Sequence, residues 1–392
     1  NTAVGAYAGQ AVSTGASNTI VGAFAGSAQT TAANNTLIGE SAGGALVTSG
    51  YNTLVGSAAG GYIIYGSRNT ALGFAALSSS APAPDSNLNE STNPYGCVAV
   101  GYDALKICKP KYDNEGYNTA VGYQAGDAIT TGLNNTFIGA HAGGSTTTVS
   151  GAVCIGIYAG SAELTADANN IVAVGRNAAG AMETGKYNTA IGAYALDACT
   201  DSDGNTAVGY GALTSQTGTV HHRMFADWGG SNPGTPAWYQ DANNTAVGAF
   251  AGSAIVEGTF NTILGAYAGE KLTSGSSNTL IGEAAGNGLL GASYNTFVGN
   301  AAGGAVYQGA ANVAVGFRAL SSSLQGHAVA GVLWQTPYAC TAVGYDALKN
   351  FHGGASYYGY NTCIGHQAGD VSTTGTGNTV IGAGADPSAN TG

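Results

Sequence analysis

A short pattern of polar and apolar positions, first seen as NTAVGAYAG in residues 1–9, occurs in twenty copies along the 392-residue chain. Counting its Asn as position one, position two is always Thr or Val, position three is always apolar, and position four is Val, Ile or Leu. Position five is always Gly and position eight is always Ala. Thirteen of the nineteen intervals between copies equal the first one, from Asn1 to Asn18. This constant period predicts a solenoid with one coil per repeat, since so short a segment cannot enclose a core alone.

Positions two to four predict a short strand in every coil, as in Thr19–Val21 and Thr136–Ile138. Successive strand side chains point to opposite faces, so positions three and four cannot both fill the coil interior. Both are nevertheless apolar, and a strand that is apolar on both faces is buried on both. We therefore expect an all-β parallel β-solenoid that packs against copies of itself around a common axis. The residues expected to form the repeat core are Val4, Gly5, Ala8, Val21, Ile38, Phe137, Ile138 and Phe297.

The remaining positions predict the turns of the coil. Gly at position five allows the chain to leave the strand, and Gly at position nine, found in twelve copies, fits a left-handed corner. A second, weaker strand is expected near positions eleven to thirteen, as in Tyr62–Ile64 and Ala254–Val256. Asn at position one is expected to form an amide ladder from coil to coil. The first ladder residues are Asn1, Asn18, Asn35 and Asn52.

Six intervals depart from the common period, and five of them follow a coil with Leu instead of Gly at position nine. We interpret this Leu as the anchor of an outward loop. The predicted organisation is coils one to twelve in residues 1–213 with a loop at 78–96, an aromatic insertion at 214–243, and coils thirteen to twenty in 244–392 with a loop at 321–339. The last segment repeats residues 1–150 with an offset of 243, which indicates a block duplication.

Composition and charge argue against two classes of function. The net charge is −11 and only 8% of residues are charged, so the chain lacks the basic stripe that nucleic-acid binding requires. No apolar run reaches the length of a membrane-spanning helix, which argues against membrane insertion. The chain starts and stops inside a repeat without an initiator Met, so we interpret it as a segment of a longer fibre.

Candidate chemistry is sparse. The six Cys include no CxxC pair, and we expect small buried hydrophobes, with interchain bridges as the alternative if position three lines an axis. Asp197, Asp201 and Asp203 resemble part of a calcium loop but lack its closing Glu, which favours an Asx-rich turn. His221 and His222 fit a solvated loop better than a metal site. No catalytic arrangement is visible, so we expect no enzyme activity, cofactor or metal.

Aromatic residues in the longest loops are the one candidate binding surface. Trp and Tyr offer large contact areas at small entropic cost, so they could stack on sugar rings or anchor a protein. The alternative is that they fold the loop back onto the solenoid. The residues concerned are Trp228, Trp238, Tyr239 and Trp334.

The recurring string N-T-x-[VIL]-G-x-x-A-[GL] resembles the NTAVGYxAL repeats of bacteriophage tail-fibre shafts over essentially the whole chain. It is also similar to the head repeats of trimeric autotransporter adhesins, although the coil of those heads is shorter than the coil here. The resemblance implies a homotrimer, a left-handed β-roll and a role in attachment. It also implies an extracellular or virion-surface location, with a cell-surface glycan or receptor as partner.

These observations predict a non-enzymatic fibre segment, most simply a homotrimeric viral tail or surface fibre that projects binding loops. A bacterial cell-surface adhesin or filament is the alternative within the same class. A monomeric ice- or surface-binding solenoid is a second hypothesis, and it requires the side chains of positions one and two to be exposed on one regular face. A fibre depolymerase is a third, and it requires acidic residues clustered in a groove.

Overall fold

The computed structural model of the chain describes residues 1–78, 93–110, 115–165, 168–215, 242–304, 306–321, 337–351, 359–372 and 375–386. The regular structure in these residues is twenty short strands, one for each predicted coil, and it includes no α-helix. The chain divides into two compact units, Asn1–Asn188 and Thr189–Gly392. Each unit holds ten of the strands.

The first unit contains β1 to β10, and the second contains β11 to β20. In chain order, the strands of the first unit are Thr2–Val4, Thr19–Val21, Thr36–Ile38, Thr53–Val55, Thr70–Leu72, Val98–Val100, Thr119–Val121, Thr136–Ile138, Val153–Ile155 and Val172–Val174. Those of the second unit are Thr189–Ile191, Thr206–Val208, Thr245–Val247, Thr262–Leu264, Thr279–Ile281, Thr296–Val298, Val313–Val315, Thr341–Val343, Thr362–Ile364 and Thr379–Ile381.

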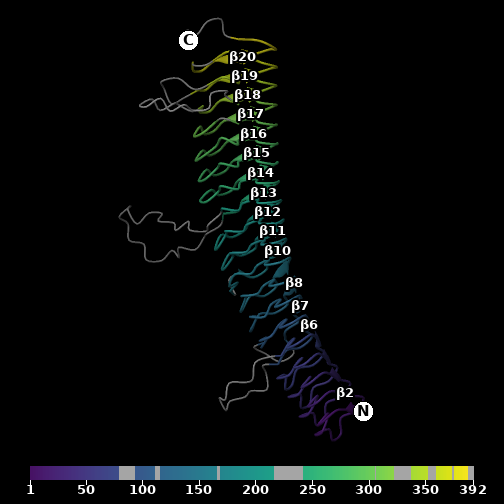
Figure 1. Cartoon of the computed structure of the whole chain (residues 1–392). Helices are drawn as coiled ribbons and strands as arrows, with labels where there is room; N and C mark the ends of the chain where they lie inside the picture. The colour runs from purple at the N-terminus through teal and green to yellow at the C-terminus, as the bar shows by residue number, and fades with distance from the viewer. Residues whose placement is uncertain are drawn as a thin grey trace, which may run out of the picture. The chain divides into compact units, whose positions relative to one another are not determined.

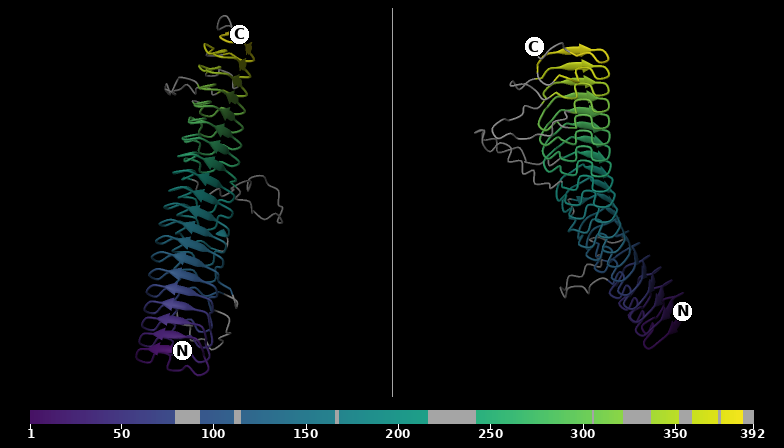
Figure 2. Two further views of the ribbon diagram at one scale, coloured as in Figure 1. Left: turned by 90° about the vertical axis from the view of Figure 1, so that its right-hand side faces the viewer. Right: turned by 45° about the horizontal axis from the view of Figure 1, so that its top comes forward.

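Within each unit, every strand pairs in parallel with the next strand of the chain, so the strands stack in one row with one strand per coil (Figures 1 and 2). In the β2–β3 pair, Thr19 lies opposite Thr36, and Ile20 lies opposite Leu37. Each position of the repeat therefore stacks on the same position of the next coil. This is a parallel β-solenoid, as predicted, and the usual coil length is 17 residues, as the ladder contacts between neighbouring coils show.

The solenoid continues across the unequal intervals. In the first unit, β5 pairs with β6 across a 28-residue interval. In the second unit, β12 pairs with β13 in register, with Thr206 opposite Thr245, across the longest interval of the chain. The hydrogen-bonded sheet is therefore continuous across both intervals. The boundary between the two compact units lies after Asn188. The boundary predicted from the sequence was the 214–243 insertion, most of which lies outside the described residues.

The interior of the coil is filled from position three. Leu37, Phe137 and Phe297 have no exposed surface. Small Ala side chains at position eight and larger ones at position twelve, such as Ile63, complete this core. Full burial of one such aliphatic or aromatic side chain stabilises the fold by about 2 kcal/mol, so the core is built from small increments repeated in every coil.

Position five requires Gly for two reasons. Its backbone is at positive φ, +133° at Gly39, where a side chain is strained. A Cβ built on Gly39 would also lie only 2.5 Å from the carbonyl oxygen of Gly56 in the next coil. The predicted role of this Gly at the strand exit is confirmed, and the close approach of neighbouring coils adds to it.

Position nine is left-handed whether it holds Gly or Leu. Gly26 has a φ of 51° and Leu77 a φ of 50°. The backbone turn is therefore the same with either residue, and the role of Leu as a loop anchor stays a prediction, because most of the loop that follows Leu77 lies outside the described residues. The Leu77 side chain is fully buried in the coil interior, so Leu contributes volume to the core rather than a different corner.

Positions three and nine share one interior volume. All six coils with Leu at position nine have Ala at position three, and all seven coils with Ile, Leu or Phe at position three have Gly at position nine. The Ala–Leu pairs are Ala71 and Leu77, Ala99 and Leu105, Ala190 and Leu196, Ala207 and Leu213, Ala314 and Leu320, and Ala342 and Leu348. A large side chain therefore enters the core from one of the two positions in each of these coils.

The expected second strand is not formed in the described residues. Ile63 and Ile255 at position twelve are buried as that prediction required, but they lie in turns. The Ile63 backbone N–H donates to the Gly60 carbonyl at 3.1 Å, which is the i to i+3 bond of a turn. Backbone bonds from coil to coil do occur beside it, from Tyr62 N–H to the Ser78 carbonyl at 2.9 Å and from Val47 N–H to the Ile64 carbonyl at 3.1 Å, but the middle donor is used within the turn and no second strand forms.

Candidate interaction face

Strand alternation decides which side chains leave the coil. In Thr36–Ile38, the middle residue Leu37 is buried, whereas Thr36 and Ile38 retain exposed surface. The same pattern holds in every strand from β2 to β20, because the middle residue is always buried and its two neighbours are not. We call the outward side chains of positions two and four the Thr–aliphatic face.

Large aliphatic side chains on this face are open to solvent. The exposed fractions are 50% for Leu72, 47% for Leu264 and 38% for Ile138. Val4, Ile38 and Ile138 are exposed, and Val21 is only partly buried, so these four residues are not part of the core of a single chain. We expected them in the repeat core because both strand faces are apolar, and the apolar pattern alone does not decide which face points inward.

The other predicted core residues divide by position. Phe137 and Phe297 are in the core, as expected. Ala8 and Gly5 belong to the first coil, where Ala8 is partly buried and Gly5 is exposed, but Ala25 and Ala42 at the same position as Ala8 are fully buried. Burial at position eight is thus a property of coils that have neighbours on both sides.

The Thr–aliphatic face carries no charge. None of the twenty coils has Lys, Arg, Asp, Glu or His at position two or four. With strands about 4.8 Å apart, the face presents one Thr or Val and one aliphatic side chain at every step along each unit. A continuous exposed apolar surface of this kind is unusual on a soluble monomer and marks an interaction site.

Aromatic side chains follow the Gly corner at positions six and seven and form stacked rows. In the first unit, the ring centroids of Phe74 and Tyr102 are 5.2 Å apart, and those of Tyr102 and Tyr123 are 5.3 Å apart. In the second unit, Phe317 and Tyr345 are 5.2 Å apart. These rows were not predicted, although aromatic residues at position six or seven of consecutive coils were a visible signal in the sequence.

A second set of exposed aromatic residues lies at the other end of the strand, just before the ladder Asn. Members of this set include Tyr51, Tyr117, Tyr187, Phe260, Tyr294 and Tyr360. Tyr51 adopts a left-handed backbone with a φ of 63°, and the other five lie between 46° and 64°. Exposed aromatic side chains therefore occur at both ends of the strands that carry the Thr–aliphatic face.

The Asn ladder lies inside the coil. The Asn35 side-chain amide donates to Asn18 Oδ1 at 3.3 Å and to the Ser49 carbonyl at 2.9 Å, and the Asn35 backbone N–H donates to the same Asn18 Oδ1 at 3.0 Å. Asn1 and Asn52 make equivalent backbone contacts with neighbouring ladder residues. The predicted ladder is confirmed, and Asn18, Asn35 and Asn52 are buried.

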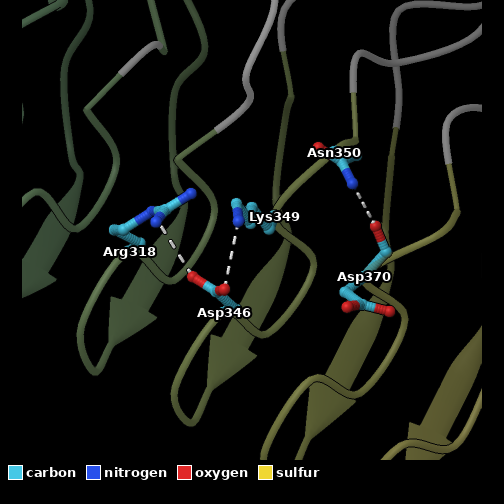
Figure 3. A network of polar contacts seen from close by, with 5 residues as sticks. All are labelled: Arg318, Asp346, Lys349, Asn350 and Asp370. Carbon is cyan, nitrogen blue, oxygen red and sulfur yellow. Dashed lines mark hydrogen bonds and ion pairs between the residues drawn. The ribbon is translucent and has the colours of Figure 1, made fainter.

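One network of charged residues joins positions seven and ten of neighbouring coils (Figure 3). Asp346 Oδ2 lies 3.1 Å from Lys349 Nζ, and Asp346 Oδ1 lies 3.5 Å from Arg318 Nε of the preceding coil. The duplicated coil has the same pair, with Lys106 Nζ 2.8 Å from Asp103 Oδ2. The Asp103 carboxylate raises the pKa of Lys106 through this hydrogen bond. These contacts join turns and need no catalytic explanation.

All six Cys are buried and unbridged. Cys154 and Cys363 at position three point into their own coils, so interchain bridges through this position are excluded by burial. Burial raises the pKa of Cys154 to about 12. The prediction of small buried hydrophobes is confirmed for these two residues. In the described part of the chain, no three His, Cys, Asp or Glu side chains are grouped as a metal site would need.

The predicted surface-binding aromatics Trp228, Trp238, Tyr239 and Trp334 lie outside the described residues, as do His221 and His222. Their binding role stays a prediction. Comparison with known proteins finds no matching family, no matching curated protein and no matching solved structure. Within the described residues, no helix has the length and apolar character needed to cross a bilayer.

Proposed function

We propose that this chain is a segment of a non-enzymatic structural fibre in which three copies pack their Thr–aliphatic faces around a common axis. The observation that supports this proposal is the exposure of uncharged aliphatic side chains at position four in both units, including Leu72 and Leu264. Covering them removes apolar surface from water at about 25 cal/mol per Å², and a threefold axis lets identical faces cover each other.

The chemistry of the face favours copies of the same chain as its partner. A charged or nucleic-acid partner would need complementary charge, and positions two and four have none. Neighbouring chains of identical repeat length also match coil for coil along the face. The resemblance to tail-fibre shaft repeats points in the same direction, and it supports a left-handed, trimeric β-roll on a virion or another extracellular surface.

Attachment is assigned to the loops rather than to the coils. The loop segments in the longest intervals contain all three Trp of the chain, whereas the coils repeat with little change. Loops that vary on a constant scaffold are typical of binding surfaces on repeat proteins. A cell-surface glycan or receptor is the proposed ligand, and a bacterial surface adhesin is the alternative setting for the same architecture.

One alternative is disfavoured by the positions of the ladder residues. A flat ice- or surface-binding array of Asn and Thr requires both side chains to be exposed, and Asn18 and Asn35 are buried inside the coil. The burial of these residues gives the fibre proposal more support than an Asn–Thr array.

Sedimentation equilibrium of the purified chain tests the proposal. We expect a mass three times that of the 38.4 kDa chain at micromolar concentration. A 38.4 kDa species over the same range would contradict the fibre assignment. Incubation with bacterial polysaccharides should release no reducing ends, and steady release would instead support the depolymerase hypothesis.

A further inference from the structure

The side chains of positions one and twelve meet inside the coil. In the coil that begins at Asn18, the Gln29 side-chain amide donates to Asn18 Oδ1 at 3.3 Å. In the second unit, Cys340 Sγ and the Phe351 ring lie beside the same backbone atom, the Cα of Gly359, because a Cβ added there would contact both. Two positions eleven residues apart in the repeat are therefore neighbours in space.

Cys97 and Cys108 occupy these two positions in one coil. Both side chains are fully buried, so in this coil the contact between positions one and twelve is a contact between two thiols. Cys97 replaces the ladder Asn, and its backbone N–H keeps the ladder contact by donating to Asn69 Oδ1 at 3.0 Å. From the next coil, the Asn118 amide donates to Cys108 Sγ at 3.6 Å, which fixes the position of the second sulfur.

We propose that Cys97 and Cys108 are a disulfide site, and that their oxidation staples this coil of the first unit through its interior. The oxidant is a small-molecule disulfide, such as oxidised glutathione. One protein sulfur first forms a mixed disulfide and releases one glutathione thiol. The second protein sulfur then attacks the protein-bound sulfur, the S–S bond to glutathione breaks, and a second glutathione thiol leaves with the proton.

Burial sets when this exchange takes place. Neither sulfur is exposed in the folded coil, so glutathione must react while the coil is open during folding, and closure then brings the second sulfur into contact. Hydrogen bonding from the Cys108 thiol, assisted by the backbone of Asn118 and Tyr117, lowers the pKa of Cys97. The backbone contacts from Asn118 and Tyr117 remain when Cys108 carries glutathione, and because the thiolate is the attacking species they favour Cys97 as the sulfur that closes the bond.

The duplication supplies a natural control. With the offset of 243, Cys97 corresponds to Cys340 and Cys108 corresponds to Phe351. The second unit therefore fills position twelve of the same coil with an aromatic ring and has no intracoil thiol pair there. Cys108→Phe converts the first coil to the residue that the second coil already accommodates.

The experiment is to refold the full chain with reduced and oxidised glutathione, denature it without reductant, add N-ethylmaleimide, and measure the intact mass. Of the six Cys, we expect four to react, and all six to react after reduction. A peptide digest should show Cys97 joined to Cys108. Six additions without reduction, or a bond between other cysteines, would overturn the proposal.

Two variants locate the bond. Cys108→Phe should show five additions with and without reduction, whereas Cys340→Ala should show three without reduction and five with it, since it keeps the proposed pair. Circular dichroism checks that both variants fold. If Cys108→Phe does not fold, the Cys340→Ala masses and the peptide map of the unaltered chain still decide the question.

Discussion

Gly at position five combines an unusual backbone with a close approach between coils. Gly282 has a φ of 129°, and a Cβ built on it would lie 2.6 Å from the carbonyl group of Gly299. Both effects oppose any other residue, so the invariance of this position across twenty copies has a direct steric cause.

Gly282→Ala should therefore destabilise the second unit by about 3 kcal/mol or more, because neither the backbone nor the next coil can relax without disturbing neighbouring coils. Gly291→Ala is the matched control, since a Cβ there meets only the Ser274 hydroxyl, at 3.1 Å. Thermal unfolding followed by circular dichroism measures both. Equal midpoints for the two variants would show that the coils are not held at this spacing.

The ladder Asn depends on having both an amide donor and an acceptor. The Asn135 side chain donates to Asn118 Oδ1 at 3.0 Å and to the Val149 carbonyl at 2.8 Å, and its Oδ1 accepts from the Ala152 backbone at 2.9 Å. A buried donor or acceptor that loses its partner costs about 1–3 kcal/mol.

Asn135→Asp should thus lower the unfolding free energy by about 2–3 kcal/mol at neutral pH, because a carboxylate cannot donate and would face other oxygens. The adjacent Asn134→Asp tests the same chemical change at an exposed site with a left-handed backbone, which Asp tolerates, and it should change stability little. Urea unfolding of the two variants compares them. If Asn135→Asp lowered the unfolding free energy no more than Asn134→Asp does, the ladder hydrogen bonds would not contribute to stability.

At the scale of the element, the coil keeps its interior volume constant through positions three and nine. In the coil of β15, a Cβ on Gly286 would lie 2.8 Å from the Leu280 side chain, so the two positions compete for the same space. Core side chains are close-packed, and both a cavity and an excess of atoms are destabilising.

A double-mutant cycle follows from this competition. Leu280→Ala should cost about 2–5 kcal/mol through the cavity it leaves, and Gly286→Leu should cost about 1–3 kcal/mol through overpacking. The double variant Leu280→Ala/Gly286→Leu reproduces the natural pair found at Ala190 and Leu196, so it should recover most of the loss. Calorimetric midpoints of the four proteins give the interaction energy. Additive losses would refute the shared-volume explanation.

The repeat was sufficient to predict the strands, their register and the Asn ladder, because a constant period brings equal positions together. It was not sufficient to predict which strand face is inside. A short strand such as Thr36–Ile38 has one apolar residue on each face, so alternation alone does not orient it. The prediction of a second strand at Ile63 was wrong for another reason. A buried apolar side chain at this position is compatible with a strand and also with the turn that the structure contains.

The role of Leu at position nine in the core was missed for a related reason. Leu77 precedes a long interval, and that correlation indicated a loop anchor, but the paired Ala71 shows that the side chain balances the core. The sequence contains the evidence for this balance, because Ala at position three and Leu at position nine occur together in the same coil. The pairing is visible only when the two positions are compared.

At the scale of the molecule, the Thr–aliphatic face connects the fold to the proposed assembly. The sequence predicted that apolar side chains would need a partner beyond the chain, and in the structure the exposed apolar strand residues are those of position four rather than position three. Position-three residues such as Phe297 are buried within the chain, so only the outward set is free to pack on neighbouring copies.

One charged side chain on this face should therefore separate the copies without unfolding the coil. Ile138→Glu places a carboxylate on the Thr–aliphatic face of β8, where a trimer would bury three of them without partners, and each such charge costs several kcal/mol. Thr131→Glu adds the same charge at an exposed turn and serves as the control. Sedimentation should give 38.4 kDa for Ile138→Glu and three times that mass for Thr131→Glu, with similar circular dichroism. A trimer that survives Ile138→Glu would mean that the copies associate through another surface, because this face cannot accommodate a buried charge in each chain.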